Sequence, residues 1–324
     1  MKRFMALILV LTLSSVFLVG CGTSQTENND TDTTVNTIDI DQNETWPRTI
    51  LDAAGNNIIL EEAPNRITLI HIVYMEYLLA LDTPPTAAAI GNALGEVEGL
   101  DKSELFAPYL KDVDMMVVGS SRDLNLEAVL ESDPDLLLTF HNPAGLEAYN
   151  KLIEIAPVAQ LDYSATWQEQ LSMIAELLGK EEKAEELITK FEKEISDAKD
   201  VLAKYEDRTF GLFRTDGKSF IAQGNSKYYE IFGIKKPTGF PDTASPTDTT
   251  SLEAVAEMNP DYIVFQHNYD ISKSFVESLE SSSVWQSMDA VKNGQIYYFD
   301  ENMNSYGPLA LSLAAEKLTE MYSK

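Results

Sequence analysis

The chain has 324 residues, with 52 acidic against 24 basic side chains and a formal net charge of −28. This charge argues against a nucleic-acid partner, because affinity for a phosphate backbone requires clustered Lys and Arg. The length suits two lobes better than one core.

Residues 1–20 predict a signal peptide. Lys2 and Arg3 precede an apolar run from Phe4 to Phe17, which is too short to span a bilayer comfortably, and Leu18-Val19-Gly20-Cys21 follows. This pattern resembles a bacterial lipoprotein signal peptide, in which Cys21 is lipidated and becomes the mature N-terminus. Cys21 is the only cysteine, so a disulfide and an internal thiol nucleophile are excluded. We therefore expect a protein anchored by lipid to the extracytoplasmic face of the cell membrane.

Residues 21–45 predict the lipidated cysteine followed by a disordered tether. From Gly22 to Glu44 the chain is Thr, Asn, Asp, Ser and Gln with almost nothing apolar. Such a segment cannot bury enough surface to offset the entropy lost on ordering. Folded sequence is expected from about Trp46.

Residues 46–165 predict an N-terminal α/β lobe. Short apolar and β-branched runs indicate strands at Arg66–Ile70, Ala87–Ile90, Met115–Val118, Leu136–Phe140 and Val158–Leu161. Helical periodicity lies between most of these runs. Strands that alternate with helices imply a parallel sheet.

Residues 166–206 predict a helical linker, and residues 207–324 a second α/β lobe. From Glu181 to Lys204 apolar residues recur at three- and four-residue steps without interruption. A helix of that length reaches about 36 Å at about 1.5 Å per residue, enough to cross from one lobe to the other. The second lobe has strand candidates at Thr209–Phe213, Ser219–Ala222, Tyr262–Gln266 and Gln295–Phe299. The predicted fold is therefore α/β, with two lobes whose central, mainly parallel sheets are joined by one long rigid helix.

A sixteen-residue segment occurs twice, at Asn125 to Phe140 and at Ser251 to Gln266, 126 residues apart. Each copy predicts a polar N-cap, a short amphipathic helix, a turn at a Pro-Asp pair and a buried strand. Each also places a glutamate, Glu127 or Glu253, in the first helical turn. A carboxylate there is favoured by the helix dipole, so local stabilisation is one interpretation and a matched pair of docking charges is the other.

The ordered set of anchor, tether, lobe with N-L-E…P-D-L, long helix and lobe with S-L-E…P-D-Y resembles a known family. It is similar to the substrate-binding lipoproteins of bacterial ABC importers for ferric siderophores, haem and cobalamin. Pro64-Asn65-Arg66-Ile67 and the segment from Leu178 to Ala184 belong to the same resemblance. In that family the glutamate of each repeated segment pairs with arginines of the permease, which implies that role for Glu127 and Glu253.

Ligands of open parallel sheets bind beyond the carboxyl ends of the strands, so the residues that follow each predicted strand are candidates for a site. This set is polar and comes from both lobes: His71, Arg122, His141, Arg214 and His267. Two guanidinium groups at a cleft indicate an anionic ligand, because repulsion from distant carboxylates is screened beyond about 8 Å.

Ion pairs of Arg122 with Asp123 and of Arg214 with Asp216 are the alternative for the two arginines. Aromatic residues that follow strands are candidates to complete the pocket, with core packing as their alternative: Tyr74, Tyr163, Trp285 and Tyr306.

Two other ligands compete with a ferric chelate. All three histidines end predicted strands, as a bare zinc or manganese site would need, but such a site would not explain the arginines. In haem-binding relatives a methionine precedes the first docking glutamate and a histidine follows the second repeated strand. His267 fits that histidine, whereas Arg122 occupies the place of the methionine.

The sequence lacks the motifs of common enzymes, such as a Walker loop, a nucleophile elbow or His-Glu-x-x-His, so we expect neither an enzyme nor a resident metal or cofactor. The resemblance implies a monomeric receptor that captures an anionic ferric siderophore between two lobes and delivers it to an ABC permease. A sensing module of a signalling complex would share this fold. Catecholate, hydroxamate and citrate chelators are all consistent with the sequence.

Overall fold

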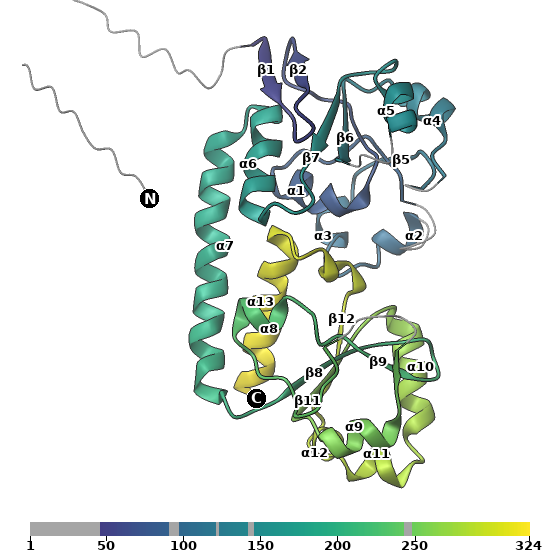
Figure 1. Cartoon of the computed structure of the whole chain (residues 1–324), viewed down its shortest axis with the longest axis vertical. Coiled ribbons are helices and arrows are strands. Elements are labelled where there is room, and N and C mark those ends of the chain that lie inside the picture. The colour runs from purple at the N-terminus through teal and green to yellow at the C-terminus, as the bar shows by residue number, and fades with distance from the viewer. Residues whose placement is uncertain (1–45, 91–96, 121–122, 142–145, 243–247) are drawn as a thin grey trace, which may run out of the picture. The chain divides into compact units, whose positions relative to one another are not determined.

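Figure 1 shows the computed structural model, which describes residues 46–90, 97–120, 123–141, 146–242 and 248–324. These residues belong to one compact unit, Asp41–Lys324. They form two five-stranded sheets and one two-stranded sheet. The predicted bounds of the lobes, 46–165, 166–206 and 207–324, stay a prediction, although each large sheet draws its strands from only one half of the chain.

The first large sheet has the order β5-β4-β3-β6-β7, and all its strands are parallel. Its strands are β3 (Ile67–Leu69), β4 (Ala87–Ala88), β5 (Met116–Val117), β6 (Leu136–Phe140) and β7 (Val158–Leu161). The connections contain the short helices η1 (Ile72–Tyr74), α1 (Met75–Ala80), α2 (Val97–Leu100), α3 (Ala107–Leu110), α4 (Leu126–Glu131) and α5 (Leu146–Leu152). All five strands lie within the ranges predicted from the sequence, because buried apolar runs between helices form parallel strands.

A hairpin that the sequence analysis did not predict precedes this sheet. Strands β1 (Arg48–Leu51) and β2 (Asn57–Leu60) pair antiparallel, and burial alternates along them. The turn carries Gly55 at a φ of +83°, and Asp52 accepts hydrogen bonds from the Ala54 and Asn56 amides. The alternation and the glycine were visible in the sequence as a hairpin signal.

Two helices lead from the first sheet to the second. Helix α6 (Trp167–Leu178) begins with a capping box between Thr166 and Glu169 and ends at Gly179. Helix α7 (Glu181–Leu202) follows and is continued by a short 3-10 turn, η3 (Ala203–Tyr205). At about 1.5 Å per residue α7 is about 33 Å long, close to the predicted length. Figure 1 shows it running alongside the unit from the first sheet toward the second.

The second large sheet has the order β10-β9-β8-β11-β12. Its strands are β8 (Phe210–Thr215), β9 (Phe220–Ala222), β10 (Thr249–Thr250), β11 (Tyr262–Gln266) and β12 (Ile296–Phe299). The predicted mainly parallel arrangement is confirmed by β8, β11 and β12, whereas β9 runs antiparallel to both of its neighbours, β8 and β10. The reason is the connection between β8 and β9, which spans only residues 216–219 and is far too short for a parallel crossover.

The remaining helices surround the second sheet and reach back to the first. They are α8 (Tyr228–Phe232), α9 (Leu252–Met258), α10 (Tyr269–Leu279), α11 (Ser283–Ser287), α12 (Asp289–Lys292), η4 (Glu301–Ser305) and α13 (Pro308–Ser323). Helix α13 packs against α7 and also against α1 of the first half. It is therefore the element of the second half that joins the core of the first (Figure 1).

The repeated segment forms the same structure twice. Asn125 and Ser251 cap α4 and α9 with their side chains, and the chain then turns through Asp133 and Asn259 at φ values of +46° and +42°. The strand that follows, β6 or β11, has a parallel neighbour on each side. The duplication predicted from sixteen residues is thus a duplicated helix, turn and central strand.

Candidate ligand-binding site

The carboxyl ends of β3, β6 and β7 bring one group of ring side chains together. The His71 ring lies edge-on to Phe140 at 4.9 Å between centroids, and Phe140 lies 6.4 Å from Tyr163. Burial lowers the pKa of His71, so this ring is neutral near pH 7. His141 follows β6, with its Nδ1 3.4 Å from Oε1 of Gln160.

The second sheet contributes Arg214, a cation without a hydrogen bond or ion pair to a described residue. Arg214 lies within β8, one residue before the end of the strand. It forms no hydrogen bond or ion pair with any of the residues that the structure describes. Asp216, the partner considered above, instead accepts the amides of Lys218 and Ser219 in the turn after β8. Arg214 therefore lies beside the strand ends without a hydrogen bond or ion pair to a described residue, and its charge acts on Glu301 and His267.

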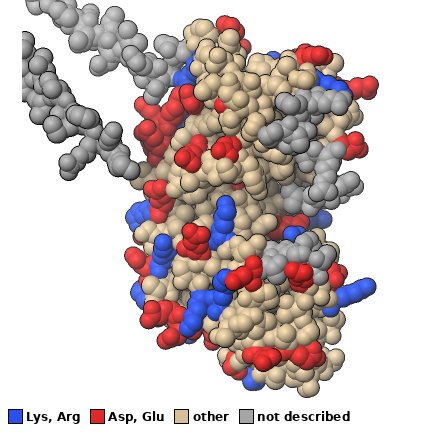
Figure 2. Space-filling model, in the orientation of Figure 1, with Lys and Arg blue, Asp and Glu red and all other residues tan. Residues whose placement is uncertain are grey.

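Two further groups share the surroundings of Arg214. Burial lowers the pKa of His267, and the charge of Arg214 lowers it further. Burial raises the pKa of Glu301, whereas the charge of Arg214 opposes that shift. The face shown in Figure 2 carries both acidic and basic side chains. Because salt screens exposed charges over about 8 Å, a cation attracts an anionic ligand mainly through direct contact.

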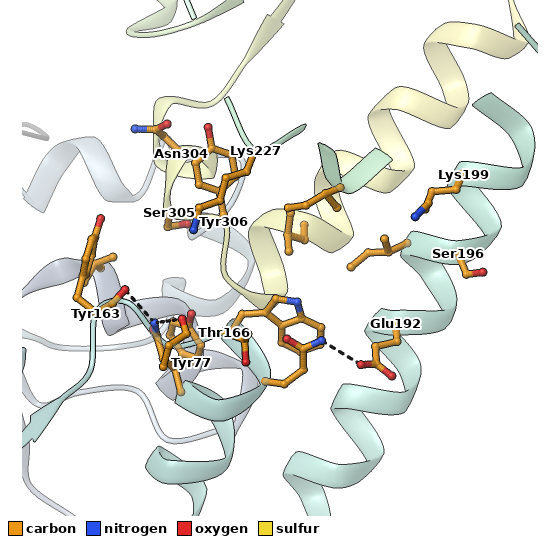
Figure 3. Close-up of a pocket in the computed structure, with 18 of the residues that line it drawn as sticks. Tyr77, Tyr163, Thr166, Glu192, Ser196, Lys199, Lys227, Asn304, Ser305 and Tyr306 are labelled. Atoms are coloured by element: carbon orange, nitrogen blue, oxygen red, sulfur yellow. Dashed lines mark hydrogen bonds between the residues drawn. The ribbon is translucent and has the colours of Figure 1, made fainter. Parts of the chain in front are cut away.

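The surface between the two sheets contains two hollows. The larger, of about 730 Å³, is lined by the loop after β7, α6, α7, α8 and the turn before α13 (Figure 3). The smaller, of about 600 Å³, is lined by residues 102–104 from the first half and by the segments that follow β11 and β12. Tyr306 lines the larger hollow and His267 the smaller, whereas Arg214, His71 and His141 line neither, so the predicted residues do not share one pocket.

Tyr306 is held at the larger hollow by an unusual backbone. Its φ is +55°, a conformation that is uncommon for a bulky side chain and typical of functional or strained positions. The hydroxyl lies 3.0 Å from the Ser226 Oγ, and the Lys227 Nζ lies 5.7 Å from the ring centroid. These contacts fix the ring at the wall of the hollow.

The comparison with known families decides what kind of protein this is. The family model described as periplasmic binding protein matches residues 69–303, which include nine of the ten strands of the two large sheets and most of the residues that line the two hollows. The chain belongs to the periplasmic binding protein family.

Two named relatives from Bacillus subtilis match most of the chain. The Fe(3+)-citrate-binding protein YfmC is 26% identical over 306 residues, which cover 93% of this chain and 90% of the relative. The iron-uptake system-binding protein is 28% identical over 295 residues, which cover 77% of this chain and 87% of the relative. Among solved structures, the petrobactin-binding protein YclQ of Bacillus subtilis matches with a TM-score of 0.66 at 20% identity. The match covers 86% of this chain and 100% of YclQ. That likeness shows the fold.

Two aromatic residues predicted for the pocket of this binding protein lie elsewhere. Tyr74 is 0% exposed and belongs to the core beside Tyr77, and Trp285 is 2% exposed among the rings of the second half. Both corrections have the same cause, since a large ring at the start of a helix gains more by packing under the sheet than by facing water. Arg122 and Cys21 lie outside the described residues.

The two glutamates of the repeat lie on the surface, away from both hollows. Glu127 and Glu253 occupy the second position of α4 and α9, and burial follows the same pattern over the first four residues of both helices. Neither forms an ion pair with a described residue. In the described part of this binding protein, no helix is both long enough and apolar enough to cross a membrane.

The residues of the larger hollow that the sequence analysis missed include Tyr77, Trp167 and Lys227. Tyr77 and Trp167 sit in helices, where the amphipathic pattern indicates core rather than pocket. Lys227 follows β9, and its position after a strand was the one signal that could have identified it.

Proposed function

We propose that this binding protein captures an anionic ferric siderophore between its two halves and delivers it to the permease of an ABC importer. The observation that carries the proposal is Arg214, a cation without a described partner at the strand ends of a protein with a net charge of −28. An unpaired guanidinium in such a place gains most from a ligand with anionic oxygens. The names of the relatives, which refer to ferric citrate and iron uptake, agree with this ligand class.

The proposal also includes the location of the protein. We infer that residues 1–20 are removed as a signal peptide and that a lipid on Cys21 holds a monomeric receptor at the outer face of the cell membrane. The support is the sequence pattern of Lys2, Arg3, the apolar run and Cys21. Glu127 and Glu253 would then be the two charges that meet the permease, one from each copy of the repeat.

Ligand titrations of wild type and single variants test the binding proposal. Trp167 lines the larger hollow, so quenching of tryptophan fluorescence can follow binding. Arg214→Ala should raise the Kd for a ferric siderophore about ten- to a hundredfold, because a charge-assisted hydrogen bond is lost from a partly desolvated site. Alanine at His71, His141 or His267 should cost less. Arg66→Ala is the matched control, since Arg66 precedes β3 and forms ion pairs with Asp133 and Asp135, whereas Arg214 forms none within the described residues.

The same titrations distinguish the alternatives. A bare zinc or manganese site predicts that the histidine changes abolish binding while Arg214→Ala does not, because only a lost imidazole removes coordination. The described residues hold no group of three or more His, Cys, Asp or Glu side chains that could bind a metal ion. Haem would concentrate the loss at His267 and shift the Soret band. Saturable quenching by zinc alone would overturn the siderophore proposal.

A further inference from the structure

Aromatic side chains from several elements line the larger hollow. Tyr163 stands at its edge with 64% of its surface exposed, Tyr306 comes from the turn before α13, and Trp167 comes from the first turn of α6 (Figure 3). Phe140 links Tyr163 to His71, so this edge of the hollow joins the strand ends beside it. Rings in this arrangement favour a flat aromatic group, which can stack or meet them edge to face.

The Tyr77 hydroxyl is a polar group of the larger hollow that a ligand can contact. Tyr77 is 3% exposed yet lines the hollow, and its hydroxyl forms no hydrogen bond with the described residues. Burial raises the pKa of Tyr77, so the hydroxyl stays a neutral donor. This hydroxyl is not among the fully buried atoms that lack a hydrogen-bond partner, so it reaches the solvent of the hollow and can donate to a ligand there.

Two basic and two acidic side chains line the larger hollow: Lys199, Lys227, Glu192 and Asp200. Lys227 and Lys199 form no ion pair within the described residues. Glu192 accepts a hydrogen bond from Gln168, and Asp200 lies beside Lys199 on α7. Both carboxylates belong to α7, whereas Lys227 lies against the Tyr306 ring. Lys227 therefore places a positive charge beside Tyr306, whereas α7, against which Trp167 packs, carries Lys199 as well as the acidic side chains.

We infer that this hollow receives an aromatic, phenolate-bearing arm of the ferric chelate, so that the ligand is a catecholate siderophore. This inference rests on the proposed function and names its substrate class. The ring would pack among Tyr163, Trp167 and Tyr306. The Tyr77 hydroxyl and the Lys227 ammonium would face its oxygens, which carry the negative charge of a ferric catecholate. A ferric hydroxamate carries little charge and would not use the Lys227 ammonium, and citrate has no ring to pack against the aromatic side chains. Neither chelate therefore matches both features of the hollow.

Equilibrium titration of the mature chain with three ferric chelates tests the inference. The probes are the ferric complexes of a tricatecholate, a trihydroxamate and citrate. The catecholate complex should bind at least about tenfold tighter than the other two. Tyr77→Phe removes only the hydroxyl and should weaken the catecholate about threefold to tenfold, and Lys227→Met should weaken it about tenfold. Binding of the other two chelates should change by less than about twofold.

Matched controls come from residues outside both hollows. Tyr205→Phe and Lys193→Met make the same chemical changes on η3 and on α7, where Tyr205 packs against Arg208 and Lys193 pairs with Asp197. Both should leave all three affinities unchanged. Preferred binding of hydroxamate or citrate would overturn the inference and leave the proposed function standing. Equal losses for all three chelates, or none in Tyr77→Phe and Lys227→Met, would also overturn it. Failure of every chelate to bind would overturn both proposals.

Discussion

Glu76 in α1 is a fully buried carboxylate that caps a helix from the other half of the chain. Its Oε2 accepts a hydrogen bond from the Ala310 amide at 2.9 Å, and α13 has no cap from a side chain of its own, since Gly307 precedes it. A Cβ at position 307 would lie 2.3 Å from the Glu76 carboxyl, so only glycine allows this approach. Burial raises the pKa of Glu76 to about 7, although hydrogen bonds from the start of α13 oppose the shift.

Glu76→Gln should change how stability depends on pH. Because the pKa rises from 4.5 in the unfolded chain to about 7 in the folded protein, the folded state binds a proton more tightly. The contribution of Glu76 to stability is then complete below about pH 4.5 and is lost as pH rises through 7, a change on the order of 3 kcal/mol. The variant should lack this decline, because glutamine keeps the acceptor and carries no charge.

Denaturant unfolding between pH 5 and pH 8 measures this difference. Glu186→Gln, which replaces an exposed carboxylate on α7, is the control and should keep the slope of the wild type. An unchanged slope in Glu76→Gln would show that Glu76 does not titrate in this range.

At the scale of elements, the aspartate of each Pro-Asp pair fixes a neighbouring strand. Asp135 accepts the amides of Asn65 and Arg66, both at 2.9 Å, immediately before β3. Asp261 accepts the amide and the hydroxyl of Thr209, at 2.7 and 2.8 Å, immediately before β8. In both halves the start of the central strand is therefore tied to the start of its parallel neighbour, which fixes the register between them.

Asp135→Ala and Asp261→Ala should each lower the free energy of unfolding by about 1–2 kcal/mol, because hydrogen bonds from backbone amides to a charged acceptor are lost. The double variant should lose about the sum, since the two sites share no partner. Chemical denaturation gives these values, and Asp112→Ala, at an exposed acid without a described hydrogen bond, is the control. A loss no larger than that of the control would mean that register is set by strand packing alone.

At the scale of the whole molecule, the two halves are joined by reciprocal contacts besides α7. Asp300, after β12, accepts the Ser103 hydroxyl at 2.5 Å and the Leu105 amide at 3.2 Å. Lys317 of α13 pairs with Glu104 at 2.5 Å. Glu76 of the first half accepts a backbone amide at the start of α13, and Asp300 of the second half accepts a backbone amide of the first. Each half therefore supplies a carboxylate that binds backbone of the other half. These bonds limit how far the halves can move apart without breaking buried polar contacts.

Transport should depend on Glu127 and Glu253 even though ligand binding does not. Replacing both by Ala should abolish uptake of the ferric chelate while its Kd changes by no more than a factor of a few, because neither residue lines a hollow. The matched control is the double variant Glu131→Ala and Glu257→Ala, which removes the same charge from the equivalent last-turn positions of α4 and α9. Uptake of radiolabelled iron by cells measures the effect. Normal uptake in the Glu127 and Glu253 variant would assign both residues to helix stabilisation only.

The sequence by itself determined the features that depend on local pattern. The strands of both large sheets, except the two-residue β10, follow from short apolar runs, and α7 follows from its unbroken helical periodicity. The repeated segment and the membership of the periplasmic binding protein family follow from residue order along the chain. Arg214 could also be chosen as a candidate ligand-binding residue, since its charge and its position at the end of a predicted strand are both evident from the sequence.

Only the tertiary structure decided which side chains meet. Tyr74 and Tyr77 lie in adjacent turns of the same region, yet one is sealed in the core and the other lines a hollow, because that outcome depends on where α13 and the loop after β7 pack. The pairing of Glu76 with Ala310 joins residues 234 positions apart, and no local pattern indicates it. Contacts across the two halves depend on how packed elements are placed in space, and residue order along the chain does not contain that placement.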